Sequence, residues 1–301
     1  MGSDGEQALR PLTFGALVLP NEPWVDLVSR WGRLEAGGVD AIWSCDHFTN
    51  PHQPGQPWFE GWSSLMGLAT STTRVRIGLL VGAIVSRSPA LLAKQAQAVD
   101  HASGGRLDVG LGAGGAPTDQ PMWGVEPWSP AERAARFAEY VGLVDRLLRS
   151  ATVTFTGEWY GTEGALMEPG FVQQPRPPLV LAAHGAKTLA TAAMFADTWN
   201  TFGPTLEDAR AHARTLDAAC ESIGRDPATI RRSVLIGLTE GTAWTSAGEF
   251  ERLVGEWVAD GFSDIVFYDP PYARAGVPAA GPEVMNELLD DVIPRLRREL
   301  S

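Results

Sequence analysis

The sequence is poor in cysteine and has no long hydrophobic run. Its two cysteines, Cys45 and Cys220, are too few for a disulfide framework in a chain of 301 residues. The first 14 residues contain no apolar stretch typical of a signal peptide, so we expect a reducing, cytoplasmic location. The most apolar run, residues 77–85, is far shorter than the roughly 20 residues that cross a bilayer and predicts a buried strand instead.

Basic residues are also scarce relative to acidic ones. The chain has 24 Lys and Arg against 36 Asp and Glu, which gives a formal net charge of −12. Such a charge repels phosphate backbones and anionic membrane surfaces. We therefore expect a small-molecule substrate, and neither nucleic acid nor a membrane as a partner.

The hydrophobic content indicates one large folded unit. With 44% hydrophobic residues, the chain has enough apolar surface for the core of an α/β barrel of roughly 250 residues. No shift in composition marks a linker, and no internal repeat is evident. We expect residues 1–12 to form a flexible N-terminal segment and residues 13–301 to form a single domain.

Strand-like and helix-like patterns alternate along the chain. Strands are predicted at 13–19, 39–43, 75–82, 107–111, 179–183, 198–202, 230–238 and 264–268. Helices are predicted at 24–36, 62–70, 89–103, 131–149, 187–195, 206–223, 247–260 and 283–300. Eight strands, each followed by a helix, predict an α/β fold of the (β/α)8 TIM-barrel type with loop insertions near 49–61, 112–130 and 152–178. An open, doubly wound parallel sheet is the alternative.

A glycine-rich segment tests that alternative. Residues 110–115 match the dinucleotide-binding pattern G-x-G-x-x-G, which requires a helix that begins at the glycines and holds a pyrophosphate. Pro117 and Pro121 follow instead, so no helix can begin there in the required way, and we interpret the match as accidental. Backbone without side chains would let a flat ligand approach closely, whereas a plain tight turn is the simpler explanation.

Asp46 and His47 stand where a predicted buried strand opens into a loop. The carboxyl ends of barrel strands are the places where such folds carry their chemistry, because the strand is rigid and the loop is accessible. The pair is therefore a candidate catalytic site. A helix cap or a turn stabilised by Asp46 would give the same local pattern.

A second strand runs into a helix at residues 179–188. Lys187 falls in the first helical turn, where the helix dipole disfavours positive charge. A phosphate on the free amides of Gly185, Ala186 and Lys187 would give that charge a partner, with Thr188 as a further donor. The segment predicts a phosphorylated ligand, although a solvated lysine remains open.

Several segments together resemble a known family. Residues 44–48 (SCDHF), 74–95, 104–114 and 178–200 are similar to the bacterial luciferase-like oxidoreductases, in order and over nearly the whole chain. The resemblance implies a TIM-type barrel that binds a flavin or the deazaflavin coenzyme F420 at its C-terminal mouth, and it implies a homodimer. The Asp-His-Phe run is most like the F420 branch, which includes glucose-6-phosphate dehydrogenases.

The resemblance also implies roles for individual residues. Asp46 would contact the ring system, and His47 would handle a proton beside the reactive carbon. Leu79 and Leu80 fall where the family often has a non-prolyl cis peptide, and Val81 and Gly82 would line the ring face. Along the cofactor tail it places Ala113, Gly114 and Gly115, and at the phosphate end it places His184, Gly185, Ala186 and Lys187.

The sequence departs from the deazaflavin sugar-phosphate dehydrogenases at two positions. Their proton-donating glutamate aligns with Gly115, and their gating tryptophan aligns with Asn50 or a neighbour, so we do not expect a sugar phosphate as substrate. Six large side chains from the insertions would form an aromatic vestibule for a less polar substrate, or would simply cover the core: Trp58, Phe59, Trp62, Met122, Trp123 and Trp128.

Four functions remain open at this point. The first is hydride transfer with coenzyme F420, and the second is an FMN-dependent monooxygenase that uses reduced flavin and oxygen. The third is a hydrolase with Asp46 and Asp108 as paired carboxylates, which is disfavoured because Asp108 alternates with Leu107 and Val109 and so faces the other side of its strand. The fourth is a cofactor-binding protein without turnover. No metal site is expected.

Overall fold

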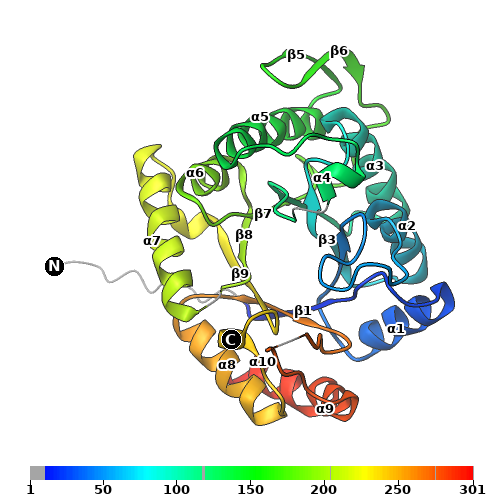
Figure 1. Ribbon diagram of the computed structural model, residues 1–301, viewed down its shortest axis with the longest axis vertical. Helices are drawn as coiled ribbons and strands as arrows, with labels where there is room; N and C mark the ends of the chain where they lie inside the picture. The colour runs from blue at the N-terminus through cyan, green and yellow to red at the C-terminus, as the bar shows by residue number, and fades with distance from the viewer. Residues whose placement is uncertain (1–10, 117–118, 204, 275, 301) are drawn as a thin grey trace.

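The protein forms a closed barrel of eight parallel strands, as the sequence predicts. The computed structural model describes residues 11–116, 119–203, 205–274 and 276–300. Around the barrel the strands lie in the order β1, β10, β9, β8, β7, β4, β3, β2. Their bounds are β1 Thr13–Leu17, β2 Ala41–Asp46, β3 Arg76–Ala83, β4 Leu107–Gly112, β7 Leu179–Ala182, β8 Thr198–Thr201, β9 Arg231–Ile236 and β10 Asp264–Tyr268. Closure of the ring excludes the open doubly wound sheet (Figure 1).

The eight predicted helices are confirmed and form the outer ring (Figure 1). Their bounds are α1 Trp24–Ala36, α2 Gly61–Ser71, α3 Pro89–Ser103, α5 Pro130–Arg149, α6 Ala186–Phe195, α7 Leu206–Ser222 and α8 Ala247–Ala259, followed by a terminal helix in three parts: α9 Pro282–Glu287, a π-helical turn Leu288–Val292, and α10 Ile293–Leu300. Local signals set these ends. Ser88 caps α3, which has Pro89 in its first turn and ends at Gly104 with φ 68°.

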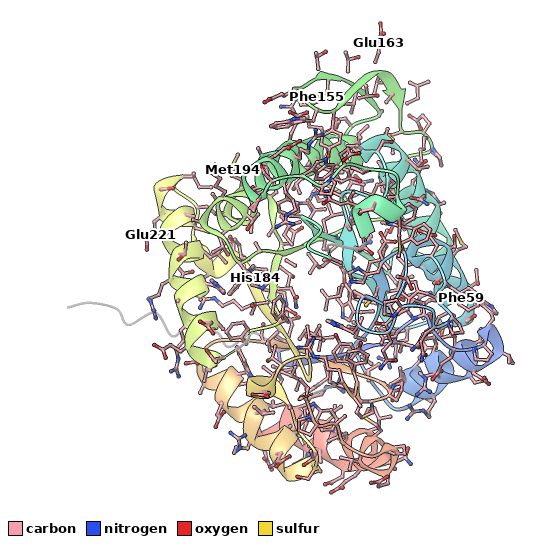
Figure 2. The ribbon with its side chains drawn as sticks, viewed as in Figure 1. Phe59, Phe155, Glu163, His184, Met194 and Glu221 are labelled. Atoms are coloured by element: carbon pink, nitrogen blue, oxygen red, sulfur yellow. The ribbon has the colours of Figure 1, made fainter. Side chains whose placement is uncertain are left out.

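The insertions carry additional elements. Residues 152–178 contain an antiparallel hairpin, β5 Thr152–Thr156 and β6 Gly161–Leu166, where we expected an extended excursion. The hairpin projects from the barrel, with Glu163 near its tip (Figures 1 and 2). The insertion at residues 112–130 contains the short helix α4, Asp119–Met122. It was not predicted because prolines interrupt the helical pattern in this segment.

Part of the predicted N-terminal segment falls outside the description. Residues 1–10 are not among the described residues, and Pro11 and Leu12 lead directly into β1. Within the described ranges, no helix combines the length and the apolar character needed to span a bilayer.

Strand β3 carries an extra residue that bends it toward the barrel interior. Its pairing with β4 passes from Gly78 and Asp108 to Gly82 and Leu111, so four steps on β3 match three on β4. The non-prolyl cis peptide joins Leu80 to Val81, one bond later than the Leu79–Leu80 position implied by the sequence.

Two glycines of the β4 motif make room for this bulge. A Cβ atom at Gly110 would lie 1.8 Å from the Leu79 carbonyl oxygen, and one at Gly112 would lie 2.5 Å from the Val81 side chain. The expectation that these glycines let a ligand approach is therefore wrong for Gly110 and Gly112, because β3 itself occupies the space.

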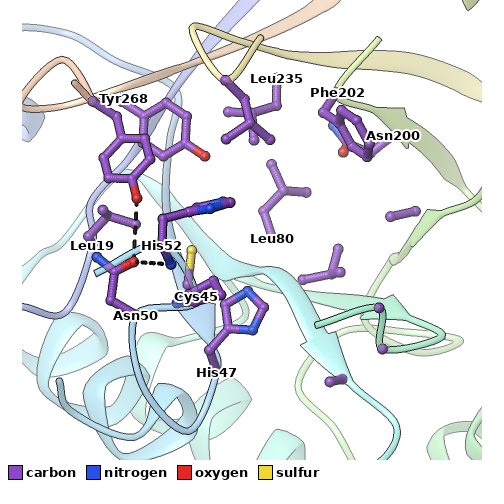
Figure 3. A pocket seen from close by; sticks show the side chains of 18 of the residues that line it. Leu19, Cys45, His47, Asn50, His52, Leu80, Asn200, Phe202, Leu235 and Tyr268 are labelled. Carbon is purple, nitrogen blue, oxygen red and sulfur yellow. Dashed lines mark hydrogen bonds between the residues drawn. The ribbon is translucent and has the colours of Figure 1, made fainter. Parts of the chain in front are cut away.

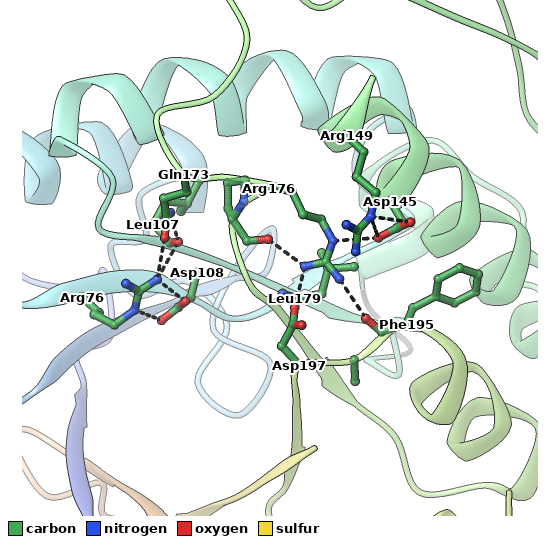
Figure 4. Close-up of polar contacts among 12 residues, drawn as sticks. Arg76, Leu107, Asp108, Asp145, Arg149, Gln173, Arg176, Leu179, Phe195 and Asp197 are labelled. Atoms are coloured by element: carbon green, nitrogen blue, oxygen red, sulfur yellow. Dashed lines mark hydrogen bonds and ion pairs between the residues drawn. The ribbon is translucent and has the colours of Figure 1, made fainter. Parts of the chain in front are cut away.

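The N-terminal end of the barrel is held by charged pairs (Figure 4). Arg76 donates from Nε to Asp108 at 2.8 Å, and Arg176 donates from Nε to Asp145 at 2.7 Å. Asp108 is the second residue of β4, whereas Asp46 is the last residue of β2. The two carboxylates thus lie at opposite ends of parallel strands, which removes the paired-carboxylate hydrolase for a stronger reason than strand alternation.

Candidate active site

A cavity of about 210 Å³ opens at the C-terminal end of the barrel (Figure 3). Strand residues supply its floor and wall: Cys45 of β2, Leu80 and Val81 of β3, Ala182 of β7, Asn200 of β8, Leu235 of β9 and Tyr268 of β10. Ala83, the last residue of β3, also lines the cavity, and loop residues complete the lining: Leu19, His47, Asn50, Pro51, His52, Trp58, Gly114, Gly115, Phe202, Leu238 and Tyr272. The lining is mainly apolar, with Asn200 across the cavity from the polar side chains of His47, Asn50 and His52 (Figure 3).

The cavity brings together some of the residues predicted from the sequence. Five of them line it: His47, Leu80, Val81, Gly114 and Gly115. Eight others are not part of this lining: Asp46, Leu79, Gly82, Ala113, His184, Gly185, Ala186 and Lys187. The bulge of β3 explains the difference along that strand, because it turns Leu80 and Val81 inward while Leu79 stays in the hydrophobic core.

Asp46 has a different role from the one expected. Its side chain is fully buried and forms an ion pair with Arg87, whose guanidinium also bonds to Glu60 at 2.7 Å. Glu60 in turn caps α2 by accepting from the amides of Trp62 and Ser63. Asp46 therefore ties the end of β2 to the neighbouring loops rather than facing the cavity, which corrects its assignment as a catalytic and ring-contacting residue.

His47 has an acidic partner that sequence reasoning missed. Its Nδ1 lies 2.6 Å from Oδ2 of Asp119, the first residue of α4. The Asp119 side chain is 4% exposed, whereas that of His47 is 31% exposed at the rim of the cavity. A buried carboxylate thus holds an accessible imidazole. The one available signal was the acid four residues after Gly115 in a long loop.

The predicted aromatic vestibule is mostly absent from the cavity. Of its six side chains, Trp58 alone contributes to the described lining, and its Nε1 donates to the His47 carbonyl at 2.9 Å. Trp62 is buried in the core, and Phe59 packs on Trp24 with ring centroids 5.5 Å apart. Figure 2 shows Phe59 at the outer edge of the molecule.

Other aromatic residues line the cavity instead. Tyr268 and Tyr272 stack with ring centroids 5.1 Å apart, and Tyr272 donates to Asn50 Oδ1 at 3.4 Å (Figure 3). The remaining aromatic side chain, Phe202, follows β8. Aromatic residues at strand ends were visible in the sequence, but only the closure of the barrel brings them together.

Burial favours the uncharged form of Cys45, His52 and Tyr268 in the lining. It raises the pKa of the Cys45 thiol to about 12, with the charge of Asp46 adding to the effect. It also raises the pKa of Tyr268 well above its usual value. The pKa of His52 is lowered, by burial first and then by the neighbouring Arg274 and His47. The cavity therefore favours a neutral, largely apolar guest.

The predicted phosphate site lies beyond one end of the cavity. Gly185 precedes α6, and no side chain of the described residues caps the first amides of that helix. Lys187 is exposed in the first turn and has no ion-pair partner among the described residues. Ala182 of the lining is three residues before Gly185, so the helix N-terminus adjoins the cavity.

His184 lies between these two places, at the inner edge of the ring of strands (Figure 2). Its Nε2 is 3.2 Å from Thr201 Oγ1, and its ring packs on Phe202 with centroids 4.6 Å apart. Burial, and then the nearby His212, lower its pKa to about 4. His184 is accordingly neutral at physiological pH and offers a hydrogen bond rather than a charge.

Metal ligands are not grouped in the described part of the chain. There, no three or more His, Cys, Asp or Glu side chains are arranged to hold a metal ion.

Comparison with known proteins identifies relatives over most of the chain. A family model described as luciferase-like monooxygenase matches residues 10–266. The F420-dependent glucose-6-phosphate dehydrogenase of Amycolatopsis mediterranei (strain U-32) is 33% identical over 169 residues, which cover 55% of this chain and 49% of the relative. The 4-hydroxyprotoasukamycin monooxygenase of Streptomyces nodosus subsp. asukaensis is 30% identical over 171 residues, which cover 52% of this chain and 43% of the relative. The chain spans about half the length of these curated relatives.

A solved structure shares the fold over almost the whole chain. The coenzyme F420-dependent tetrahydromethanopterin reductase from Methanopyrus kandleri superposes with a TM-score of 0.78, covering 95% of this chain and 99% of the other. The sequence identity is 15%, so the likeness concerns the fold.

Proposed function

Because the chain belongs to the luciferase-like monooxygenase family, we propose that it is an oxidoreductase that uses coenzyme F420 for hydride transfer to or from a small organic substrate. One observation carries the proposal. The imidazole of His47, held by Asp119, stands at the rim of an apolar cavity at the C-terminal end of the barrel. This is the end at which barrel enzymes carry out their reactions.

The cavity fits a flat, mostly apolar ring system. The β3 bulge presents Leu80 and Val81 as one wall, and Leu235 lies among the residues that complete it. At the edge, no atom of the described residues beyond its chain neighbours lies within 4 Å of the position that a Cβ of Gly115 would take, which leaves room for a ligand beside its backbone. We propose that these residues hold the ring, as the family resemblance implies for Leu80 and Val81.

The N-terminus of α6 fits the phosphate of the tail. The amides of Gly185, Ala186 and Lys187 lie at the positive end of the helix dipole, and the Lys187 side chain adds a full positive charge. Gly114, with φ 75°, lines the cavity along the path between ring and tail. His184, which is neutral, contributes a hydrogen bond at most.

The cofactor and the side chains of the site have separate roles in the proposed reaction. F420, when bound, supplies or accepts the hydride. His47 takes or gives the accompanying proton at the cavity rim, a task suited to an imidazole. The apolar wall excludes water from the reacting atoms and holds the substrate against the ring face. The neutral lining and the absence of a glutamate at Gly115 favour a substrate less polar than a sugar phosphate.

An FMN-dependent monooxygenase is the second candidate. It is favoured by the monooxygenase among the relatives and by the description of the family model. The same cavity and the same helix N-terminus would serve FMN, whose phosphate also needs an anion site.

The first proposal also includes a homodimer and a cytoplasmic location. Light scattering of the purified protein tests the homodimer, and the low cysteine content supports the cytoplasmic location.

Titration of the purified protein with each cofactor separates the candidates. We expect oxidised F420 to bind with at least tenfold higher affinity than FMN, measured by the change in cofactor fluorescence. The bound F420 should then bleach on addition of an oxidisable small organic substrate, such as an alcohol from a panel. Preferential binding of FMN would support the monooxygenase. Binding of F420 without bleaching or recovery across a broad panel of alcohols, ketones and enones would indicate a carrier without turnover.

A further inference from the structure

We propose that Asp119 is a positioning residue that fixes the tautomer and the orientation of His47. The inference rests on the proposed function in one respect, namely that His47 handles the proton. The hydrogen bond itself joins two side chains of the chain and can be tested independently of that function.

The geometry assigns the proton of neutral His47 to Nδ1. A carboxylate only accepts hydrogen bonds when it is ionised, so the 2.6 Å contact with Asp119 Oδ2 requires a proton on Nδ1. A neutral imidazole has one proton, and Nε2 is then left unprotonated. Nε2 has no hydrogen-bond partner among the described residues, and the ring lines the cavity. The pair thus leaves an acceptor available to a guest.

Asp119 also holds the chain on which His47 stands. Its other oxygen, Oδ1, accepts from the backbone amide of Phe48 at 3.4 Å. The Phe48 ring meets Trp123 edge to face, with centroids 4.9 Å apart. The α4 turn therefore docks on residues 47 and 48 through a carboxylate and an aromatic contact, and both restrain the imidazole.

No second anion competes for this role in the described part of the chain. Asp119 supplies the one carboxylate within ion-pair distance of His47 there. The other titratable groups of the cavity lining are His52, which lies beside Arg274 at 3.2 Å, and Cys45 and the two tyrosines. None of these is an anion at neutral pH that could orient the imidazole.

The substitution Asp119→Asn tests the role with little change in shape. The amide of Phe48 needs an acceptor, so the new side chain should turn its oxygen to Phe48 and its NH2 group to His47 Nδ1. That arrangement forces the proton onto Nε2. Asp119→Glu keeps an acceptor for Nδ1 and should retain the original tautomer. Glu256→Gln removes one negative charge from an exposed ion pair and serves as the matched control.

The readout is the ¹⁵N spectrum of histidine-labelled protein without cofactor. The chain has five histidines, and the signal of His47 is identified by its loss in His47→Gln. At a pH at which His47 is neutral, we expect the Nδ1–H tautomer in the unaltered protein, in Asp119→Glu and in Glu256→Gln, and the Nε2–H tautomer in Asp119→Asn. An Nε2–H tautomer in the unaltered protein overturns the proposal, as does an unchanged tautomer in Asp119→Asn. If Asp119→Asn does not fold, the His47 tautomers of the unaltered protein and of Asp119→Glu still test the proposal.

Kinetics provide the second arm. If the enzyme transfers hydride, Asp119→Asn should lower kcat by about 100-fold or more while KM changes by less than about twofold, because the wrong tautomer offers no acceptor. Unchanged kcat with the altered tautomer would overturn the positioning role. A protein that binds neither F420 nor FMN would refute the proposed function, whereas the spectra would still report on Asp119 and His47.

Discussion

The guanidinium of Arg87 and the carboxylate of Asp46 form a buried ion pair that locks the end of β2 to the loop after β3. Arg87 Nη2 lies 3.0 Å from Asp46 Oδ1, and the two side chains are 4% and 0% exposed. The Arg87 carbonyl also accepts from Tyr140 of α5 at 3.2 Å. The residue before the candidate catalytic histidine is therefore fixed from several sides.

We predict that Asp46→Ala destabilises the fold without weakening cofactor binding. Removal of the carboxylate leaves the buried Arg87 charge with the partly exposed Glu60 as its remaining ion-pair partner among the described residues, so the loss should be at most about 3–5 kcal/mol of unfolding free energy. Chemical denaturation measures this loss, and cofactor affinity of the folded protein should stay within about twofold. Glu256→Ala, in an exposed pair, should cost less than about 1 kcal/mol. A stable Asp46→Ala variant with greatly reduced cofactor affinity would instead indicate that Asp46 contacts the cofactor.

Most of the fold could be predicted from the sequence because its signals are local. The alternation of apolar strands with amphipathic helices gave all eight strand and helix pairs, and the family match confirms the resemblance carried by the short segments. The observed strand ends differ from the predicted ones by a few residues, because strand pairing rather than local propensity decides where a strand ends.

The site was predictable only where its residues are close in sequence. His47 is recognisable from a short segment, and the family resemblance implied the cis peptide of β3, although the cis bond lies one position later than expected. Asp119 is 72 residues from His47 and lies in a loop broken by prolines, so no local pattern joins them. Asp46 was misassigned because its partner Arg87 is 41 residues away, so no local pattern reveals the ion pair, and because an acid beside a histidine is typical of both catalysis and structural pairing.

We predict that Gly110→Ala disrupts the cavity through the β3 bulge. The new methyl group would collide with the Leu79 carbonyl, and relief requires the backbone before Leu80 and Val81 to move. The expected loss is about 1–3 kcal/mol of unfolding free energy, together with weaker cofactor binding. Gly255→Ala in α8, where the methyl group meets no atom within 4 Å, should stabilise slightly. Equal behaviour of the two variants in thermal unfolding would argue against the close packing of β3 on β4.

We predict that Lys187→Ala selectively weakens a cofactor that carries phosphate. Loss of the charge at the N-terminus of α6 should reduce affinity about tenfold for F420, and less than twofold for a deazaflavin without phosphate. Fluorescence titration gives both constants. Lys94→Ala, which removes the only other lysine, from α3, is the control. An equal loss for both ligands would contradict the assignment of the phosphate site.

We predict that His184 makes the protein less stable in mild acid. Its pKa is lowered from 6.5 to about 4 in the folded state. Between these values the unfolded chain binds the proton and the folded chain does not, so the free energy of unfolding falls as the pH drops below about 6.5 and stops falling near 4. From pH 7 to 5 the loss should be about 1–2 kcal/mol.

The substitution His184→Gln isolates this contribution. Denaturation at pH 7 and pH 5 should show a smaller loss in His184→Gln than in the unaltered protein or in His101→Gln, which changes an exposed histidine. The same loss in all three proteins would mean that His184 is not the source of the acid sensitivity.

The most direct measurement is a crystal structure of the protein saturated with oxidised F420. The account predicts the deazaflavin ring in the cavity against Leu80 and Val81, its phosphate on the amides of residues 185–187, and His47 Nε2 facing the reactive side of the ring. A ring bound elsewhere, or a cavity that stays empty at saturating F420, would contradict it.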